Sequence, residues 1–178
     1  LGANTLTIAG GGSISSTNAL VLENADSQLS ITGNIVLSGA QVTAALTTGI
    51  VISESSTITT LTIGALTPVA IAADKSLSGT IVVNSGGTLQ LTLAGNLASA
   101  VTLNGGTLDI DETLVINGTI THIASSSIDM AQNKTLTYSG AALEVGAHIL
   151  TLQGGGIWTS ANALKLNQTG GLVELFGI

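Results

Sequence analysis

Pairs of apolar residues separated by one residue recur along the whole chain. In an extended strand, side chains two positions apart point to the same face. Each pair therefore predicts a strand whose two apolar residues face a core and whose middle residue faces outward. The steps between the first members of successive pairs are 23, 21, 19, 20, 19, 20, 22 and 23 residues. The pairs are Leu6/Ile8, Leu29/Ile31, Ile50/Ile52, Val69/Ile71, Leu89/Leu91, Leu108/Ile110, Ile128/Met130, Leu150/Leu152 and Val173/Leu175.

A pattern that returns about every twenty residues predicts a solenoid of stacked coils. Further apolar pairs lie between the first ones, and Gly, Asn, Ser and Asp between them supply turns. Each coil then carries about three short strands. We predict an all-β fold, a single-stranded parallel β-helix (β-solenoid) of about nine coils of 19–23 residues. We expect it to be right-handed, because the irregular steps lack the strict hexapeptide of left-handed β-helices. The further pairs include Leu20/Leu22, Ile35/Leu37, Ile81/Val83, Val101/Leu103, Leu114/Ile116 and Leu136/Tyr138.

A β-sandwich is the rival fold, since it too is built from many short strands. The regular return of the apolar pairs favours the solenoid. The low aromatic content agrees with it, because thin coils stack small aliphatic side chains.

A longer period overlies the first. Residues 1–24 align without gaps to residues 145–168 with 12 identities in 24. The offset of 144 residues spans seven coil steps. We therefore expect one solenoid domain over 1–178, in which 1–144 is a seven-coil block and 145–178 begins a second, similar block. The alternative is a self-contained subunit whose two ends resemble each other because they meet identical neighbours.

Neither end of the sequence carries a polar cap. Solenoids normally close with one, because a bare end exposes apolar side chains and unpaired backbone groups. We expect both ends to contact identical copies or adjoining solenoid repeats. The residues expected at these ends are Leu1, Leu6, Ile8, Val173, Leu175, Phe176 and Ile178.

The composition is unusual for a globular protein. Only 7% of residues are charged and 2% are aromatic, with 23 glycines and one proline. The mean hydropathy of +0.60 argues against disorder. The apolar runs are shorter than the roughly 18 to 20 residues of a helical membrane span, so we expect no membrane insertion. A net charge of −7 without arginine argues against nucleic acid. The chain has no cysteine, which excludes a disulfide framework and a thiolate metal site.

Carboxylates gather at one place on the predicted outer surface. Gln90, Asp109 and Asp129 occupy the same outward position on successive coils, between Ala70 and Thr151. Asp111 and Glu112 stand nearby, so Asp109, Asp111, Glu112 and Asp129 are a weak calcium candidate. Asp109 and Asp129 would also be the acid and base of a carbohydrate-active enzyme, which is an unfavoured alternative. We expect an acidic surface with no catalytic residues and no required cofactor.

Other polar residues carry weaker expectations. His122 and His148 are isolated in the sequence, and we expect each to be a surface or turn residue. Asn117, Asn133 and Asn167 begin glycosylation sequons, which are more simply chance matches in a chain rich in Asn, Ser and Thr.

The phrases at 3–7 (ANTLT), 84–89 (NSGGTL) and 104–108 (NGGTL) make the chain resemble the passenger domains of bacterial autotransporters and filamentous haemagglutinin-like adhesins. The resemblance implies a secreted right-handed β-helix that forms a stalk or fibre at a cell surface, with a host surface or glycan as a possible partner. We accordingly expect a non-catalytic structural rod outside the cell. The alternative is a filament or sheath subunit that stacks end to end.

Overall fold

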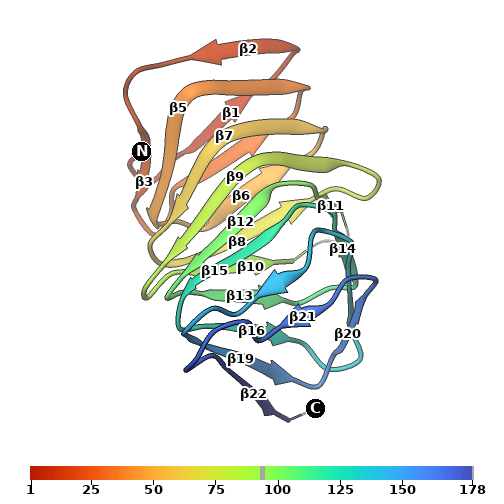
Figure 1. Cartoon of the computed structure of the whole chain (residues 1–178). Helices are drawn as coiled ribbons and strands as arrows, with labels where there is room; N and C mark the ends of the chain where they lie inside the picture. Colours follow the sequence, from red (N-terminus) through yellow and green to blue (C-terminus); the bar gives the residue numbers. More distant parts are fainter. Residues whose placement is uncertain (93–94, 178) are drawn as a thin grey trace.

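The computed structural model describes residues 1–92 and 95–177 of the chain. In this part every regular element is a β-strand, and no segment forms a helix long and apolar enough to cross a membrane. The strands stack as successive coils from the N-terminus to the C-terminus, as the change of colour along the stack shows (Figure 1). The predicted parallel β-solenoid is confirmed.

One side of every coil contributes a strand to a nine-stranded parallel sheet, which we call the first face. Nine stacked strands enclose about eight turns of the chain, and each contains one of the predicted apolar pairs. In order along the sheet they are β1 (Thr5–Ile8), β4 (Gln28–Ile31), β6 (Gly49–Ile52), β8 (Leu66–Ile71), β10 (Thr88–Leu91), β13 (Thr107–Ile110), β16 (Ser126–Met130), β19 (Ile149–Gly154) and β22 (Leu172–Phe176).

The other strands of the coils form the second and third faces, most of them in one eleven-stranded sheet. Three long strands, β5 (Ile35–Leu46), β7 (Ser56–Ile63) and β9 (Ser76–Asn84), bend at a corner and serve both faces. The second face also contains β2 (Gly12–Ser15), β11 (Asn96–Leu97), β14 (Leu114–Ile116), β17 (Thr135–Tyr138) and β20 (Ile157–Ser160). The third face also contains β3 (Leu20–Glu23), β12 (Ala100–Asn104) and β15 (Ile120–Ala124).

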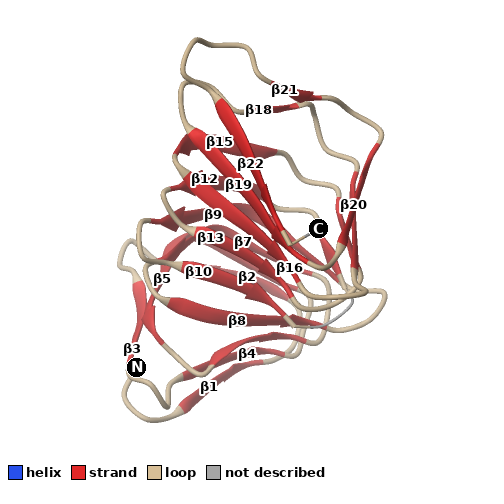
Figure 2. Ribbon diagram, turned by 90° about the horizontal axis from the view of Figure 1, so that it is seen from below, coloured by secondary structure: helices blue, strands red, loops and turns tan. Residues whose placement is uncertain are grey.

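The third face is interrupted near the C-terminus. Among the described strands, β15 pairs with β12 alone. The two following coils contribute β18 (Leu143–Glu144) and β21 (Leu164–Lys165), which pair with each other in a separate two-stranded sheet. Figure 2, which views the stack from below, shows β18 and β21 at the rim of the last coils. This interruption leaves one edge of β15 without a neighbouring strand in the described structure.

The three faces enclose a single narrow core. It is filled by the apolar pairs of the interior coils, and Leu29, Ile50, Leu89 and Leu108 are fully buried. Most of the pairs predicted on the other strands are buried in the same core, Leu20 being only partly buried. Stacked branched aliphatic side chains therefore hold the coils together through apolar burial.

The register of the first face differs from the prediction at two places. Leu91, and not Leu89, lies opposite Val69. Likewise Ile128 lies opposite Leu152 and not opposite Leu150. Each shift is two residues, so every apolar side chain keeps its inward direction while its neighbour changes. The predicted direction of the side chains is confirmed, but the predicted stacking is wrong at these two steps.

The corner of β9 requires a glycine. Gly79 has a φ of 114°, a conformation that residues with a side chain rarely adopt. A Cβ atom at this position would lie 1.8 Å from the carbonyl oxygen of Ile58 on the neighbouring coil. The bend that lets one strand serve two faces therefore depends on the absence of a side chain.

Candidate functional site

The structure brings the predicted outward residues of the first face into one row. Gln90 lies opposite Asp109, and Asp109 lies opposite Asp129. Because of the second register shift, Gln153 follows Asp129 in place of Thr151, and its Nε2 donates a hydrogen bond to Asp129 Oδ2 at 2.7 Å. We call these four residues the acidic row.

The two neighbouring carboxyl groups of the acidic row are not equivalent. Partial burial raises the pKa of Asp109 from 3.8 to about 6, and the charges of Asp111 and Asp129 raise it further in the same direction. The proton of Asp109 is therefore held more tightly than that of an ordinary surface aspartic acid.

The other predicted calcium ligands have protein partners. Asp111 accepts a hydrogen bond from Gln90 Nε2 at 2.7 Å, and Glu112 forms an ion pair with Lys134 at 2.6 Å. In residues 1–92 and 95–177, no group of three or more His, Asp or Glu side chains is placed to hold a metal ion. The acidic patch therefore offers no assembled calcium site within that part of the chain.

Every lysine bridges two coils. Lys75, Lys134 and Lys165 lie 2.7, 2.6 and 3.9 Å from Glu54, Glu112 and Glu144 respectively. In each pair the glutamate precedes the lysine by 21 or 22 residues, which is one coil. These exposed pairs link neighbouring coils weakly and leave few free positive charges on the surface.

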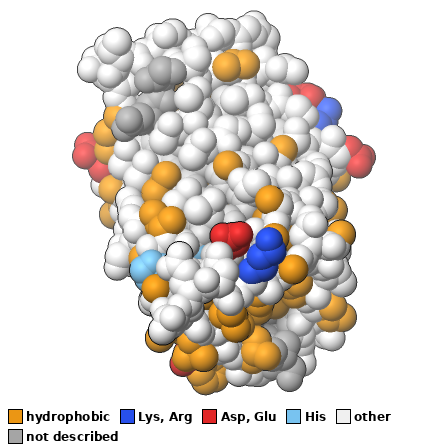
Figure 3. All heavy atoms as spheres, in the orientation of Figure 1, with side chains coloured by type: hydrophobic (Ala, Val, Ile, Leu, Met, Phe, Trp, Pro, Cys, Tyr) orange, Lys and Arg blue, Asp and Glu red, His pale blue; other side chains and the backbone are white. Residues whose placement is uncertain are grey.

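The C-terminal face of the stack exposes apolar side chains that interior coils bury. Leu175 is 58% exposed, whereas Ile31, its counterpart at the offset of 144 residues, is fully buried. Figure 3 shows apolar side chains gathered at the lower end of the molecule. The exposed apolar residues of the last coils are Ile149, Ile157, Leu164, Leu166, Leu172, Leu175 and Phe176, and Val173 is partly buried.

The N-terminal face has the same character to a smaller degree. Ile14 is 44% exposed, and Leu1, Leu6 and Ile8 are only partly buried against the core. These are inward positions that are fully covered one coil further along. The predicted end residues thus lie on two open faces, except Ile178, which lies outside the described residues.

The expectation that the two histidines are isolated surface residues is wrong for His122. Its side chain is only 5% exposed, and its ring packs edge-on against His148 with centroids 5.9 Å apart. Ile120 and His122 both point inward from β15, while Ile123 lies outside, because the register shifts after His122. A hydrophobicity ranking favours Ile123 for the core, but strand alternation from Ile120 places His122 there.

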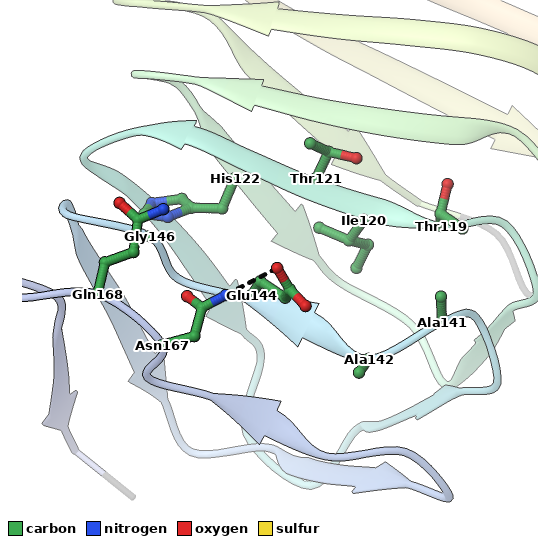
Figure 4. Close-up of a pocket in the computed structure, with 10 residues that line it drawn as sticks. All are labelled: Thr119, Ile120, Thr121, His122, Ala141, Ala142, Glu144, Gly146, Asn167 and Gln168. Carbon is green, nitrogen blue, oxygen red and sulfur yellow. Dashed lines mark hydrogen bonds between the residues drawn. The ribbon is translucent and has the colours of Figure 1, made fainter.

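His122 also borders a cavity of about 370 Å³ beside the unpaired edge of β15. Thr119, Ile120 and Thr121 line it from β15 and the residue before that strand. Glu144 and the end residues Asn167 and Gln168 line it from the following coils (Figure 4). Sequence reasoning missed this cavity, because it results from the interruption of the third face.

The three sequon asparagines are exposed and lie outside strands. Asn133 has a positive φ of 62°, which marks a turn. Asn167 Nδ2 donates a hydrogen bond to Glu144 Oε2 at 2.8 Å. All three side chains are therefore accessible, and their modification stays an open prediction.

No family model matches the chain, and neither the curated proteins nor the solved structures contain a significant match to it. The fold and the surfaces described above are consequently the basis for any functional inference.

Proposed function

We propose that the chain is a non-catalytic structural stretch of an extracellular adhesin or cell-surface fibre, and that further solenoid coils cover both of its open faces. The observation that carries this proposal is the exposure of core positions on the last coil. Leu175 and Phe176 are more than half exposed to water, although the same face of each interior coil is covered by the next coil. An adjoining coil would remove this apolar surface from water.

The internal repeat indicates which coil fits the C-terminal face. Strands β19, β20, β21 and β22 recur at an offset of 144 residues from β1, β2, β3 and β4, within one or two residues at their starts. The turn also recurs, since Ser16 and Ser160 each accept a hydrogen bond from the backbone N–H two residues later. Strands β2 and β3 are covered by β5, and β4 is covered by β6. The coil that follows residue 178 in the proposed array would therefore resemble residues 35–55.

This proposal can be tested by extending the chain. Residues 35–55 would be appended after Ile178, so that the copies of β5 and β6 follow β22 in the phase of the repeat. We expect the backbone amides of Val173 and Leu175 to exchange with solvent more slowly, because the new strand covers their edge. Hydrogen exchange measured by mass spectrometry reads this out.

A matched extension serves as the control. It carries serine at the six inward positions of the appended coil and should leave the exchange of β22 unchanged. Equal exchange rates in β22 for both extensions would contradict the proposal. The six positions are Ile35, Leu37, Val42, Ala44, Ile50 and Ile52.

A second candidate, a filament or sheath subunit that stacks on identical copies, is favoured by the same two open faces. The two candidates differ in covalent structure. Protease mapping of native material should give one very long polypeptide for an array of blocks. Stacked copies should instead dissociate in denaturant into units of the length of this chain.

A further inference from the structure

We infer that the cavity beside β15 is a binding site for a neutral sugar residue. This inference goes beyond the structural role and does not depend on it. The cavity volume of about 370 Å³ lies within the range of roughly 300–1,000 Å³ that is usual for small-molecule sites. The site exists because the third face is interrupted after β15, so that the next coil leaves a hollow there.

The first argument is the identity of His122. The inward positions in register with it on the four preceding coils are Ala44, Ile63, Val83 and Leu103. All four are fully buried aliphatic residues. An imidazole in such a row must be desolvated, and apolar packing gives it no compensating hydrogen bond.

The second argument is the unpartnered nitrogen of His122. Its Nδ1 lies 2.9 Å from the carbonyl oxygen of Val145, which only accepts, so Nδ1 carries the hydrogen and Nε2 carries a lone pair. Nε2 is buried and has no hydrogen-bond partner among the described residues. A buried acceptor of this kind is destabilising unless a ligand or water donates to it.

The remaining lining defines the chemistry of the ligand. Figure 4 shows Glu144 and Asn167 joined by a hydrogen bond at one side of the cavity, and the amide of Gln168 at another. Ile120, Ala141 and Ala142 form an apolar wall. Carboxylate and imidazole acceptors, amide groups and an apolar wall together suit a molecule with hydroxyl groups on its edge and C–H groups on its face. A sugar ring has both.

The charges favour a neutral ligand. Glu144 is the acidic group of the cavity lining, and Lys165 Nζ lies 3.9 Å from its Oε1. This ion pair leaves no excess positive charge to attract an anion. A sugar hydroxyl can donate to the glutamate and to His122 Nε2 without adding charge to the site.

Nuclear magnetic resonance of the whole chain tests the inference. Methyl glycosides of glucose, galactose, mannose and N-acetylglucosamine would each be added at millimolar concentration. We expect saturation transfer from the protein to at least one of them, together with a change in the ¹⁵N resonance of His122 Nε2. Both signals should weaken by about tenfold in apparent affinity in His122→Leu, because one buried hydrogen bond is lost.

Glu144→Gln is the second variant, because Glu144 is half exposed and its substitution does not endanger folding. It should weaken binding by a similar factor. Glu54→Gln removes the equivalent carboxylate from the Glu54–Lys75 pair on a distant coil and should bind as the parent does. The absence of any sugar-induced signal would overturn the inference, as would unchanged binding in both variants. A shift of His122 Nε2 with Zn²⁺ alone and with no glycoside would also overturn it.

Discussion

Replacing Asp109 with asparagine should stabilise the protein at neutral pH. The folded state raises the pKa of this carboxyl from 3.8 to about 6, mainly by burial and also through the charges of Asp111 and Asp129. An acid whose pKa is raised on folding stabilises the fold only while it is protonated. Its contribution is therefore complete below pH 3.8 and is lost as the pH rises through about 6.

The magnitude follows from the difference between the two pKa values. Between 3.8 and about 6 it corresponds to about 3 kcal/mol for a fully shielded group. Asp109 is only partly buried, and water screens it, so we expect about 1 kcal/mol. Asparagine keeps the shape of the side chain, carries no charge at any pH, and can donate a hydrogen bond to Asp129 in the row.

Urea unfolding followed by circular dichroism would measure the effect at pH 7.5 and at pH 3.5 for both proteins. The Asp109→Asn variant should be more stable than the parent by about 1 kcal/mol at the higher pH and equal to it at the lower pH. Asp26→Asn, in an exposed turn, should change stability by less than about 0.5 kcal/mol at both. Equal destabilisation by Asp109→Asn at both pH values would refute the reasoning, because it would mean that the carboxylate makes a favourable contact.

Two further pairs of substitutions test the fold. Leu29→Asp buries an unpaired charge at a fully enclosed position and should prevent folding, whereas Ser30→Asp, which points outward from the same strand, should leave the circular dichroism spectrum unchanged. Gly79→Ala should cost about 3 kcal/mol or more in urea unfolding, because the new methyl group meets the carbonyl of Ile58. Gly86→Ala, at a positive φ with open space around it, should cost about 1 kcal/mol. Similar tolerance within either pair would contradict the assigned directions or the corner geometry.

The inward and outward directions of the strands could be predicted from the sequence, because alternation with period two is a local property. Leu89 and Gln90 illustrate this, since one is fully buried and the other lies in the outward row. The stacking of particular residues is not local. A shift of two residues between β8 and β10 preserves every inward direction, so the apolar pattern contains no information that distinguishes the two registers.

The sugar site could not be predicted for a different reason. It depends on where the third face is interrupted, and the short strand β18 gives no sign in the sequence that it fails to pair with β15. One signal was nevertheless available. Counting two residues on from the inward Ile120 reaches His122, so strand alternation alone would have identified a histidine in the core.

The central claim is that the core of this solenoid continues beyond both open faces. Cryo electron microscopy of the protein as isolated from its source tests it most directly. The account predicts long unbranched filaments with an axial repeat of about 4.8 Å, the spacing of stacked strands. Dispersed particles about 40 Å long, the height of eight coil spacings of about 4.8 Å, would contradict it, because the apolar ends would then be stable in water.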